Sequence, residues 1–190
     1  MLPLLFVNVA TLKVKKTDMI IIFEGIVDTG KSTLINYMRS TYNIPVWKRI
    51  KTQENCTDWH SYIASSRDIC LNMYEILHDS GQHVNIMHDR FHVSTALQLG
   101  DDRGSIISYS NRLHAVGSVI VYTYCSDLDA LRVRLKDRNK SLDIQQLHNR
   151  HEEAISAIEL DSSISVIRID TCKMGINDCC EKIVHGILKK

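Results

Sequence analysis

Glycine, lysine and hydroxyl residues stand close together in this chain at a spacing that suits phosphate binding. Gly25 and Gly30 precede Lys31 and Ser32, which fits the pattern G-x-x-x-x-G-K-[ST] at every fixed position. Glycines allow backbone N–H groups to turn inward around a phosphate. We expect Lys31 to contact the β- and γ-phosphates of a nucleotide and the Ser32 hydroxyl to hold Mg²⁺. The residues predicted to bind the phosphates of ATP are Gly25, Asp28, Thr29, Gly30, Lys31, Ser32 and Thr33.

The segments on either side of this loop are of the kinds that a phosphate loop requires. Residues 19–23 form a short apolar run rich in β-branched side chains, which predicts a buried parallel strand. Residues 33–39 carry apolar side chains at helical spacing. A helix in that place adds free N–H groups and the positive end of its dipole. Strand, loop and helix together predict a site for nucleotide phosphates.

A carboxylate and a guanidinium group follow another apolar segment. Residues 84–88 are predicted to form a strand, and Asp89 and Arg90 stand at its end. Asp89 is predicted to hold Mg²⁺ directly or through water, or to orient the attacking oxygen. Arg90 offers a planar fork that suits a phosphate. A purely structural Asp–Arg pair is the alternative, and the phosphate loop favours the functional interpretation.

Basic side chains near the end of a later helical segment form a third group. Arg134 and Arg138 are four residues apart and so share a helix face. Transfer of a γ-phosphoryl group needs cations over its oxygens, and a mobile lid can deliver them. We predict such a lid around residues 134–146; a solvated basic face is the alternative. The predicted catalytic residues are Lys31, Asp89, Arg90, Arg134 and Arg138.

A polar stretch after residue 50 supplies a fourth group. Glu54 is able to take a proton from a hydroxyl or to contact a sugar, and Trp59 is able to stack on a base. Exposed loop residues are the alternative interpretation for both. Whether Glu54 or Asp89 acts as the base stays open at this point.

Segments of strand type alternate with segments of helix type through the rest of the chain. The predicted strands cover residues 19–23, 44–50, 84–88, 118–124 and 164–169. The predicted helices follow the phosphate loop and cover residues 61–78, from 94 onward, 106–115, 127–136, 143–160 and 177–188. This alternation predicts an α/β fold, a three-layer sandwich in which helices flank a five-stranded parallel sheet. Ligands bind beyond the carboxyl ends of such strands.

Length and charge exclude several classes of protein. The 190 residues suit one domain, which we place at residues 19–190, with residues 1–18 as an N-terminal extension. The net charge of +1 provides no global field toward nucleic acid or a membrane. No segment has the uninterrupted apolar length that spans a bilayer. Apolar residues 1–9 precede lysines rather than follow them, which is the wrong order for a secretory signal.

The six cysteines are scattered, without a C-x-x-C pair or zinc spacing. We expect them to be reduced thiols, which suits a cytosolic compartment. They are Cys56, Cys70, Cys125, Cys172, Cys179 and Cys180.

From residue 19 to its C-terminus the chain resembles the thymidylate kinase and deoxynucleoside kinase group of P-loop kinases. Residues 23–34 look like the first strand and phosphate loop of that group. Residues 89–98 are similar to the thymidylate kinase segment D-R-[FY]-x-x-S-x-x-A-Y-Q-G, shortened by a residue. Residues 130–138 are similar to the helix that enters its lid, and residues 168–171 match a common strand ending. Of the R-E-P motif of thymidylate kinases only Glu54 is kept, and Leu97 replaces the aromatic residue before Gln98.

The resemblance implies ATP with Mg²⁺, a nucleotide or nucleoside acceptor and often a homodimer. It favours a pyrimidine deoxynucleoside monophosphate as the acceptor, in the cytoplasm of the cell or of a phage host. Arg90 would clamp the acceptor phosphate, Gln98 would pair with a base edge, and Phe91 and Trp59 would be walls for the ring. The predicted substrate-binding residues are Glu54, Trp59, Arg90, Phe91 and Gln98.

Other functions stay open. A deoxynucleoside kinase would use Glu54 as the hydroxyl base. A phage-type kinase acting on a modified base in DNA, such as 5-hydroxymethyluracil, would have DNA as its partner. A regulatory module of another class would bind the nucleotide without transferring its phosphate.

Overall fold

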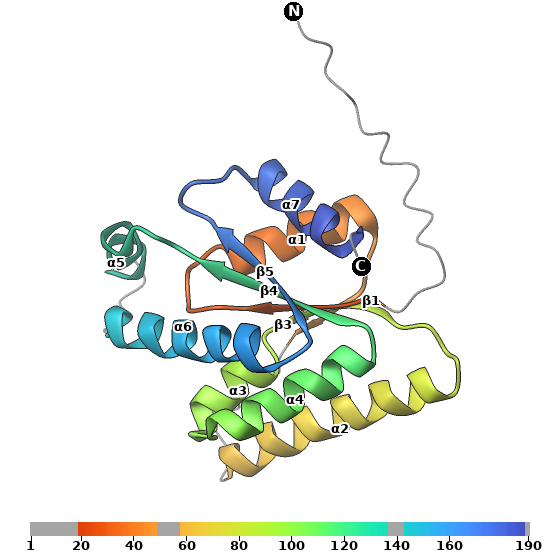
Figure 1. The fold of residues 1–190 in the computed structure, drawn as a ribbon. Helices are drawn as coiled ribbons and strands as arrows, with labels where there is room; N and C mark the ends of the chain where they lie inside the picture. Colours follow the sequence, from red (N-terminus) through yellow and green to blue (C-terminus); the bar gives the residue numbers. More distant parts are fainter. Residues whose placement is uncertain (1–18, 49–57, 137–142, 189–190) are drawn as a thin grey trace, which may run out of the picture.

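A five-stranded parallel sheet forms the centre of the molecule, in the strand order β2-β3-β1-β4-β5 (Figure 1). The computed structural model describes residues 19–48, 58–136 and 143–188. The strands are β1 (Met19–Glu24), β2 (Val46–Lys48), β3 (Asn85–Asp89), β4 (Ser118–Tyr124) and β5 (Ser165–Asp170). The predicted α/β fold with a five-stranded parallel sheet is therefore confirmed.

Helices cover both faces of this sheet. α1 and α7 pack on one face, whereas α2, α3, α4 and α6 pack on the other (Figure 1). α5 lies near the carboxyl edge, in a small apolar cluster with the phosphate loop and the start of α6. The helices are α1 (Lys31–Tyr42), α2 (Trp59–Asp79), α3 (His92–Leu99), α4 (Arg103–Ala115), α5 (Leu128–Lys136), α6 (Ile144–Asp161) and α7 (Ile176–Leu188).

The central strands β1 and β4 are apolar almost throughout because they are covered on both faces. Ile20 and Ile22 pack toward α2, α3, α4 and α6, whereas Ile21 and Phe23 pack toward α1 and α7. This alternation follows from the two-residue period of a strand. It brings the residues after β1 and β3 to the same edge, since Phe23 pairs with Asp89.

Element boundaries differ from the sequence predictions mainly near this edge. β2 starts at Val46 rather than residue 44, and residues 49–50 lie outside the described range. α3 starts at His92 rather than residue 94, because a buried carboxylate from β1 accepts hydrogen bonds from backbone N–H groups at the start of this helix.

The expectation that all cysteines are reduced is wrong for one pair. Cys125 and Cys172 form a disulfide, with their Cα atoms 5.2 Å apart. The pair is 47 residues apart in sequence, but β4 and β5 are neighbouring strands, so the residues that follow their ends meet. Cys70, Cys179 and Cys180 are buried free thiols, as expected. Cys56 lies outside the described residues.

Within the described ranges, no helix is long and apolar enough to span a membrane.

Candidate active site

The loop between β1 and α1 adopts a conformation that its two glycines permit. Gly25 has φ of 133°, and a Cβ atom there would lie 2.1 Å from the backbone oxygen of Thr123. Gly30 has φ of 77° and is the N-cap of α1. Both conformations strain residues with a side chain. The glycines of the motif are therefore explained by the backbone path, and the loop leads directly to the N-terminus of a helix.

Threonines fasten this loop to the sheet. Thr29 is fully buried, and its hydroxyl donates to the backbone oxygen of Ile26 at 2.9 Å. The hydroxyl of Thr29 also lies 3.0 Å from that of Thr123 on β4. Asp28 has φ of 62°, a conformation that aspartate tolerates better than most residues. Thr33 is exposed on the first turn of α1.

Lys31 is folded back onto the loop that precedes it. Its ammonium group donates to the backbone oxygen of Gly25 at 2.8 Å, to that of Ile26, and to the Thr29 hydroxyl at 3.2 Å. Its exposed fraction is only 5%. Burial lowers the pKa of Lys31 well below its usual value, and the nearby charge of Arg90 lowers it further. The loop thus holds a cation whose partners are neutral oxygens, an arrangement that an anionic phosphate would improve.

Ser32 and Asp89 face each other across the carboxyl ends of β1 and β3. The Ser32 hydroxyl donates to Oδ2 of Asp89 at 3.4 Å. One hydroxyl and one carboxylate fit Mg²⁺, which prefers oxygen ligands and keeps waters or substrate phosphates for its other positions. Among the described residues no group of three His, Cys, Asp or Glu side chains forms a metal site. The donor set therefore suits a metal ion that arrives with a nucleotide.

Arg90 occupies a strained position beside Asp89. Its φ is 71°, a conformation that costs of order 1–3 kcal/mol for a residue other than glycine. Its backbone N–H donates to Phe23 at 2.9 Å, and its guanidinium Nη1 donates to the Ser94 hydroxyl at 3.2 Å. Strain of this kind accumulates at functional sites.

Glu24 is a residue of the site that the sequence analysis missed. It is fully buried at the end of β1. Its carboxylate accepts hydrogen bonds from the backbone N–H groups of Phe91 at 2.9 Å and Val93 at 3.1 Å, and from the Ser94 hydroxyl. Negative charge at a helix N-terminus is favourable. Glu24 therefore fixes the start of α3 and the backbone that carries Arg90. The available signal was a carboxylate closing an otherwise apolar strand.

A cavity lies next to Arg90, between the ends of β2 and β3 and the helices α2 and α3. Of the five predicted substrate-binding residues, Arg90 and Phe91 line it. Trp59 instead stacks on Tyr62 at a ring distance of 5.7 Å, and Gln98 is exposed on α3. Glu54 lies outside the described residues. The cavity is lined by Trp47, Tyr62, Ile63, Ser66, Arg67, Cys70, His88, Arg90, Phe91 and Thr95.

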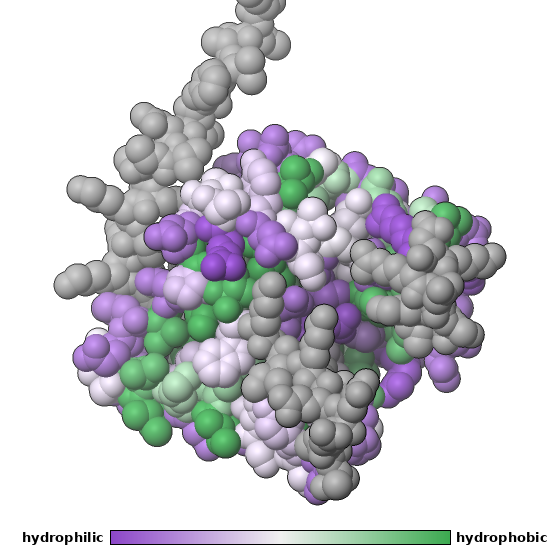
Figure 2. Space-filling view, turned by 180° about the vertical axis from the view of Figure 1, so that it is seen from behind, coloured by the Kyte–Doolittle hydropathy of each residue, from purple (hydrophilic) through white to green (hydrophobic). Residues whose placement is uncertain are grey.

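A more apolar hollow adjoins this cavity along α2. Trp47 and Tyr62 line both, and Ile69 and Met73 extend the hollow along the helix. Figure 2 shows apolar side chains interrupting the polar surface on the rear face of the molecule. The cavity beside Arg90 thus continues into an open, apolar surface.

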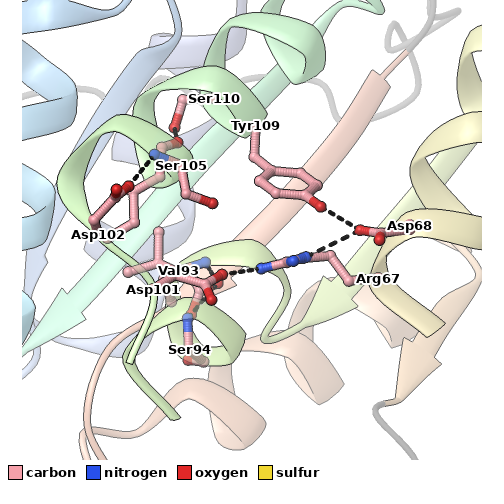
Figure 3. A network of polar contacts seen from close by, with 11 residues as sticks. Arg67, Asp68, Val93, Ser94, Asp101, Asp102, Ser105, Tyr109 and Ser110 are labelled. Carbon is pink, nitrogen blue, oxygen red and sulfur yellow. Dashed lines mark hydrogen bonds and ion pairs between the residues drawn. The ribbon is translucent and has the colours of Figure 1, made fainter. Parts of the chain in front are cut away.

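Arg67, which the sequence analysis also missed, is held firmly in the cavity wall. Its Nη1 donates to Asp101 at 2.6 Å and its Nε donates to Asp68 at 3.2 Å (Figure 3). Its guanidinium lies 3.9 Å from the centre of the Tyr109 ring, and Tyr109 donates to Asp68. This network joins α2 to α4 and to the segment before it, so the position of Arg67 depends on three separate parts of the chain.

His88 forms another part of the cavity wall. Burial lowers its pKa to about 4, so the imidazole is neutral at pH 7. Its Nε2 bonds with the hydroxyl of Tyr74, and its ring lies 4.9 Å from that of Phe91. A neutral, hydrogen-bonded histidine gives this wall an aromatic character suited to a planar ligand.

The predicted lid is described only in part. Arg134 is exposed on α5, whereas Arg138 lies outside the described residues, and α6 starts at Ile144. The shared helix face of the two arginines therefore stays a prediction. On the described part of α5, Leu131 and Leu135 belong to the same small apolar cluster as Ile26 of the phosphate loop.

Comparison with known proteins defines the fold. No protein-family model matches the chain, and no curated protein matches its sequence. The YorR protein of Bacillus subtilis, solved with phosphorylated GDP, matches 87% of this chain and 94% of its own, at 16% identity and a TM-score of 0.57. Deoxyadenosine kinase of M. mycoides, solved with dCMP and dCDP, matches 90% and 99%, at 18% identity and a TM-score of 0.51.

Polyphosphate kinase 2 of Arthrobacter aurescens TC1 shares the fold as well. It matches 93% of this chain and 70% of its own, at 14% identity and a TM-score of 0.53. At such identities the similarity concerns the fold alone. The chain therefore has the α/β fold of P-loop kinases.

Proposed function

We propose that the protein is a phosphotransferase that uses ATP and Mg²⁺ to phosphorylate a pyrimidine deoxynucleoside monophosphate. The observation that carries this proposal is the meeting of three groups at one sheet edge: the phosphate loop with Lys31, the Ser32–Asp89 pair at 3.4 Å, and Arg90 at the mouth of a cavity. Each belongs to one part of a phosphoryl transfer.

On the donor side, Lys31 would exchange the neutral oxygens that it now contacts for the β- and γ-phosphates. The N–H groups of the loop and of the start of α1 would surround the same phosphates. Ser32 and Asp89 would hold Mg²⁺, which neutralises charge on the phosphates when it is bound. Asp28, Thr29 and Gly30 of the loop and Thr33 at the start of α1 would join this phosphate site, and Arg134 and Arg138 would act from the lid.

On the acceptor side, Arg90 would hold the acceptor phosphate through its planar fork. Phe91 would bound the pyrimidine ring, and Trp47 and Tyr62, which line the cavity, would serve as the further walls for which Trp59 was predicted. The M. mycoides structure with dCMP and dCDP provides an example of a pyrimidine deoxynucleotide on the same fold. Asp89 or Glu54 would orient the attacking oxygen.

Transfer of radiolabelled phosphate from ATP tests the proposal directly. The acceptors are dTMP, dCMP, thymidine, deoxycytidine and DNA containing 5-hydroxymethyluracil. We expect labelled diphosphates from the monophosphates. Label on nucleosides alone would favour a deoxynucleoside kinase, and label on DNA alone would favour a base kinase, for which the open hollow beside Trp47 gives room. Slow ATP hydrolysis at a rate that is the same with and without each acceptor would favour a regulatory nucleotide-binding module.

The quaternary structure and location remain predictions. The prediction of a homodimer is based on the resemblance to the kinase group, and light scattering would test it by measuring the mass of the protein in solution. The cytoplasmic location now rests on the proposed function alone, because a disulfide is uncommon in cytosolic proteins.

A further inference from the structure

His151 on α6 carries a buried nitrogen that has no use in the proposed chemistry so far. Only 6% of the residue is exposed. Its Nδ1 lies 2.9 Å from the backbone oxygen of Leu147, and its Nε2 is buried without a hydrogen-bond partner among the described residues. Unpaired buried polar atoms are rare, and each calls for an explanation.

The contact at Nδ1 determines what Nε2 is able to bind. A carbonyl oxygen only accepts, so Nδ1 must carry the proton that it shares with Leu147. Burial lowers the pKa of His151 to about 4, and the charges of Arg90 and Lys31 act in the same direction, so the ring is neutral at pH 7. In this tautomer Nε2 is a lone-pair acceptor. It would repel a phosphate and attract a hydroxyl or an amino group.

The helix places this acceptor between the two halves of the site. Leu147, one turn before His151, packs against the small apolar cluster that contains Ile26, and Ile155, one turn after it, belongs to the core cluster that contains Phe91. Residues four apart lie on one helix face. His151 therefore lies on the helix face between these two clusters, where the charges of Arg90 and Lys31 act on it.

We propose that Nε2 of His151 accepts a hydrogen bond from a sugar hydroxyl of the acceptor substrate. The inference rests on the proposed function. In a nucleotide the sugar joins the base to the phosphate. His151 lies one turn before a residue of the core cluster that contains Phe91, the residue assigned to the base, and the charge of Arg90, assigned to the phosphate, acts on it. The 3′-hydroxyl is the hydroxyl that remains free in a deoxynucleoside monophosphate, so His151 would select acceptors that carry it.

The test compares dTMP with 3′-deoxythymidine monophosphate in kcat/KM. We expect the wild type to prefer dTMP by about 10- to 100-fold, because the analogue leaves the buried nitrogen unpaired. His151→Phe, which keeps the ring and removes the acceptor, should lower kcat/KM for dTMP and leave the analogue nearly unchanged. His151→Gln, whose amide oxygen restores an acceptor, should recover part of the preference.

His185→Phe is the matched control. His185 on α7 makes the same contact with a carbonyl one turn earlier, that of Glu181 at 3.0 Å, but is exposed. This variant should behave as the wild type. Equal losses on dTMP and on the analogue in His151→Phe would mean a structural role and would overturn the proposal.

A second measurement is independent of the variants. The ¹⁵N resonance of the His151 Nε2 should shift when dTMP binds and not when the 3′-deoxy analogue binds; no difference between the two would overturn the proposal. If the wild type phosphorylates thymidine and not dTMP, the same comparison uses thymidine and 3′-deoxythymidine, so a failure of the assigned acceptor is separated from a failure of His151. If neither is a substrate, the proposed function and this inference both fall.

Discussion

The phosphate loop and the cavity that we propose for the acceptor share the carboxyl edge of one sheet, yet one is built from neighbouring residues and the other from segments far apart in the sequence. The loop uses consecutive residues between β1 and α1, and Lys31, the first residue of α1, donates to three oxygens of that loop. The cavity takes residues from β2, α2, β3 and α3, and its cation Arg67 is held by Asp101, 34 residues away.

This difference determines how each half tolerates change. The shape of the loop is set by local backbone conformations, such as that of Gly25, so it needs little beyond its neighbours. The shape of the cavity is set by how α2, α3 and α4 pack together. We therefore expect donor binding to be a stable property of this fold, and acceptor choice to vary with packing.

The largest expected effect is a loss of turnover when Lys31, at the phosphate loop, is replaced. Lys31→Ala removes the cation that would stabilise charge on the transferred phosphoryl group, and kcat should fall by about 10²- to 10³-fold. Steady-state kinetics measure it, and circular dichroism checks the fold. Lys182→Ala, an exposed lysine on α7, is the control and should be neutral. Undiminished transfer by a folded Lys31→Ala protein would disprove the assignment.

The disulfide beside the phosphate loop, where Cys125 belongs to the same apolar cluster as Ile26 of that loop, should contribute to the stability of the fold. Reduction of the Cys125–Cys172 disulfide should lower the free energy of unfolding by about 2–4 kcal/mol, because the bond closes a long loop in the unfolded chain. Urea unfolding with and without reductant measures the effect. A Cys125→Ser variant should show the lower value in both conditions. The same stability with and without reductant in the wild type would contradict this prediction.

Arg90→Ala should affect the use of the acceptor much more than the binding of ATP. Loss of a charged hydrogen-bond donor to the acceptor phosphate should lower kcat/KM for monophosphates by about 10- to 100-fold and change ATP affinity little. Arg132→Ala is the control, since Arg132 pairs with the exposed Asp129 on α5. If ATP affinity falls and the response to acceptors stays the same, Arg90 belongs to the donor half and the comparison fails.

The smallest expected effect concerns the cavity wall. The unfolded chain protonates His88 near pH 6.5, whereas the folded chain does so only near pH 4. The neutral form is therefore favoured by folding, and this contribution is complete above pH 6.5 and is lost as the pH falls. Between pH 7 and pH 5 the free energy of unfolding should drop by about 2 kcal/mol on account of His88.

The comparison for this last prediction is His88→Gln, which retains a polar partner for Tyr74 but does not titrate. Urea unfolding at several pH values should show a shallower pH dependence in this variant. An identical pH dependence would mean that His88 is not buried in its neutral form.

Sequence reasoning was most successful where a structure depends on near neighbours. The phosphate loop follows from glycines that are needed for local backbone angles, and the strands β1 and β4 follow from apolar runs. It was wrong about Cys125 and Cys172, because strand order, not sequence distance, makes them neighbours. It predicted that Trp59 and Gln98 contact the acceptor; neither is among the residues that line the cavity, and their role stays a prediction.

The sequence by itself determined the α/β class, the parallel sheet and the phosphate loop, since periodicity and glycine spacing are local properties. Only the tertiary structure decided that Glu24 holds the start of α3, that Arg67 and His88 line the cavity, and that Nε2 of His151 is buried without a hydrogen-bond partner among the described residues. The physical reason is that burial and most side-chain hydrogen-bond pairing depend on groups brought together from distant parts of the chain. No spacing along the sequence records those encounters.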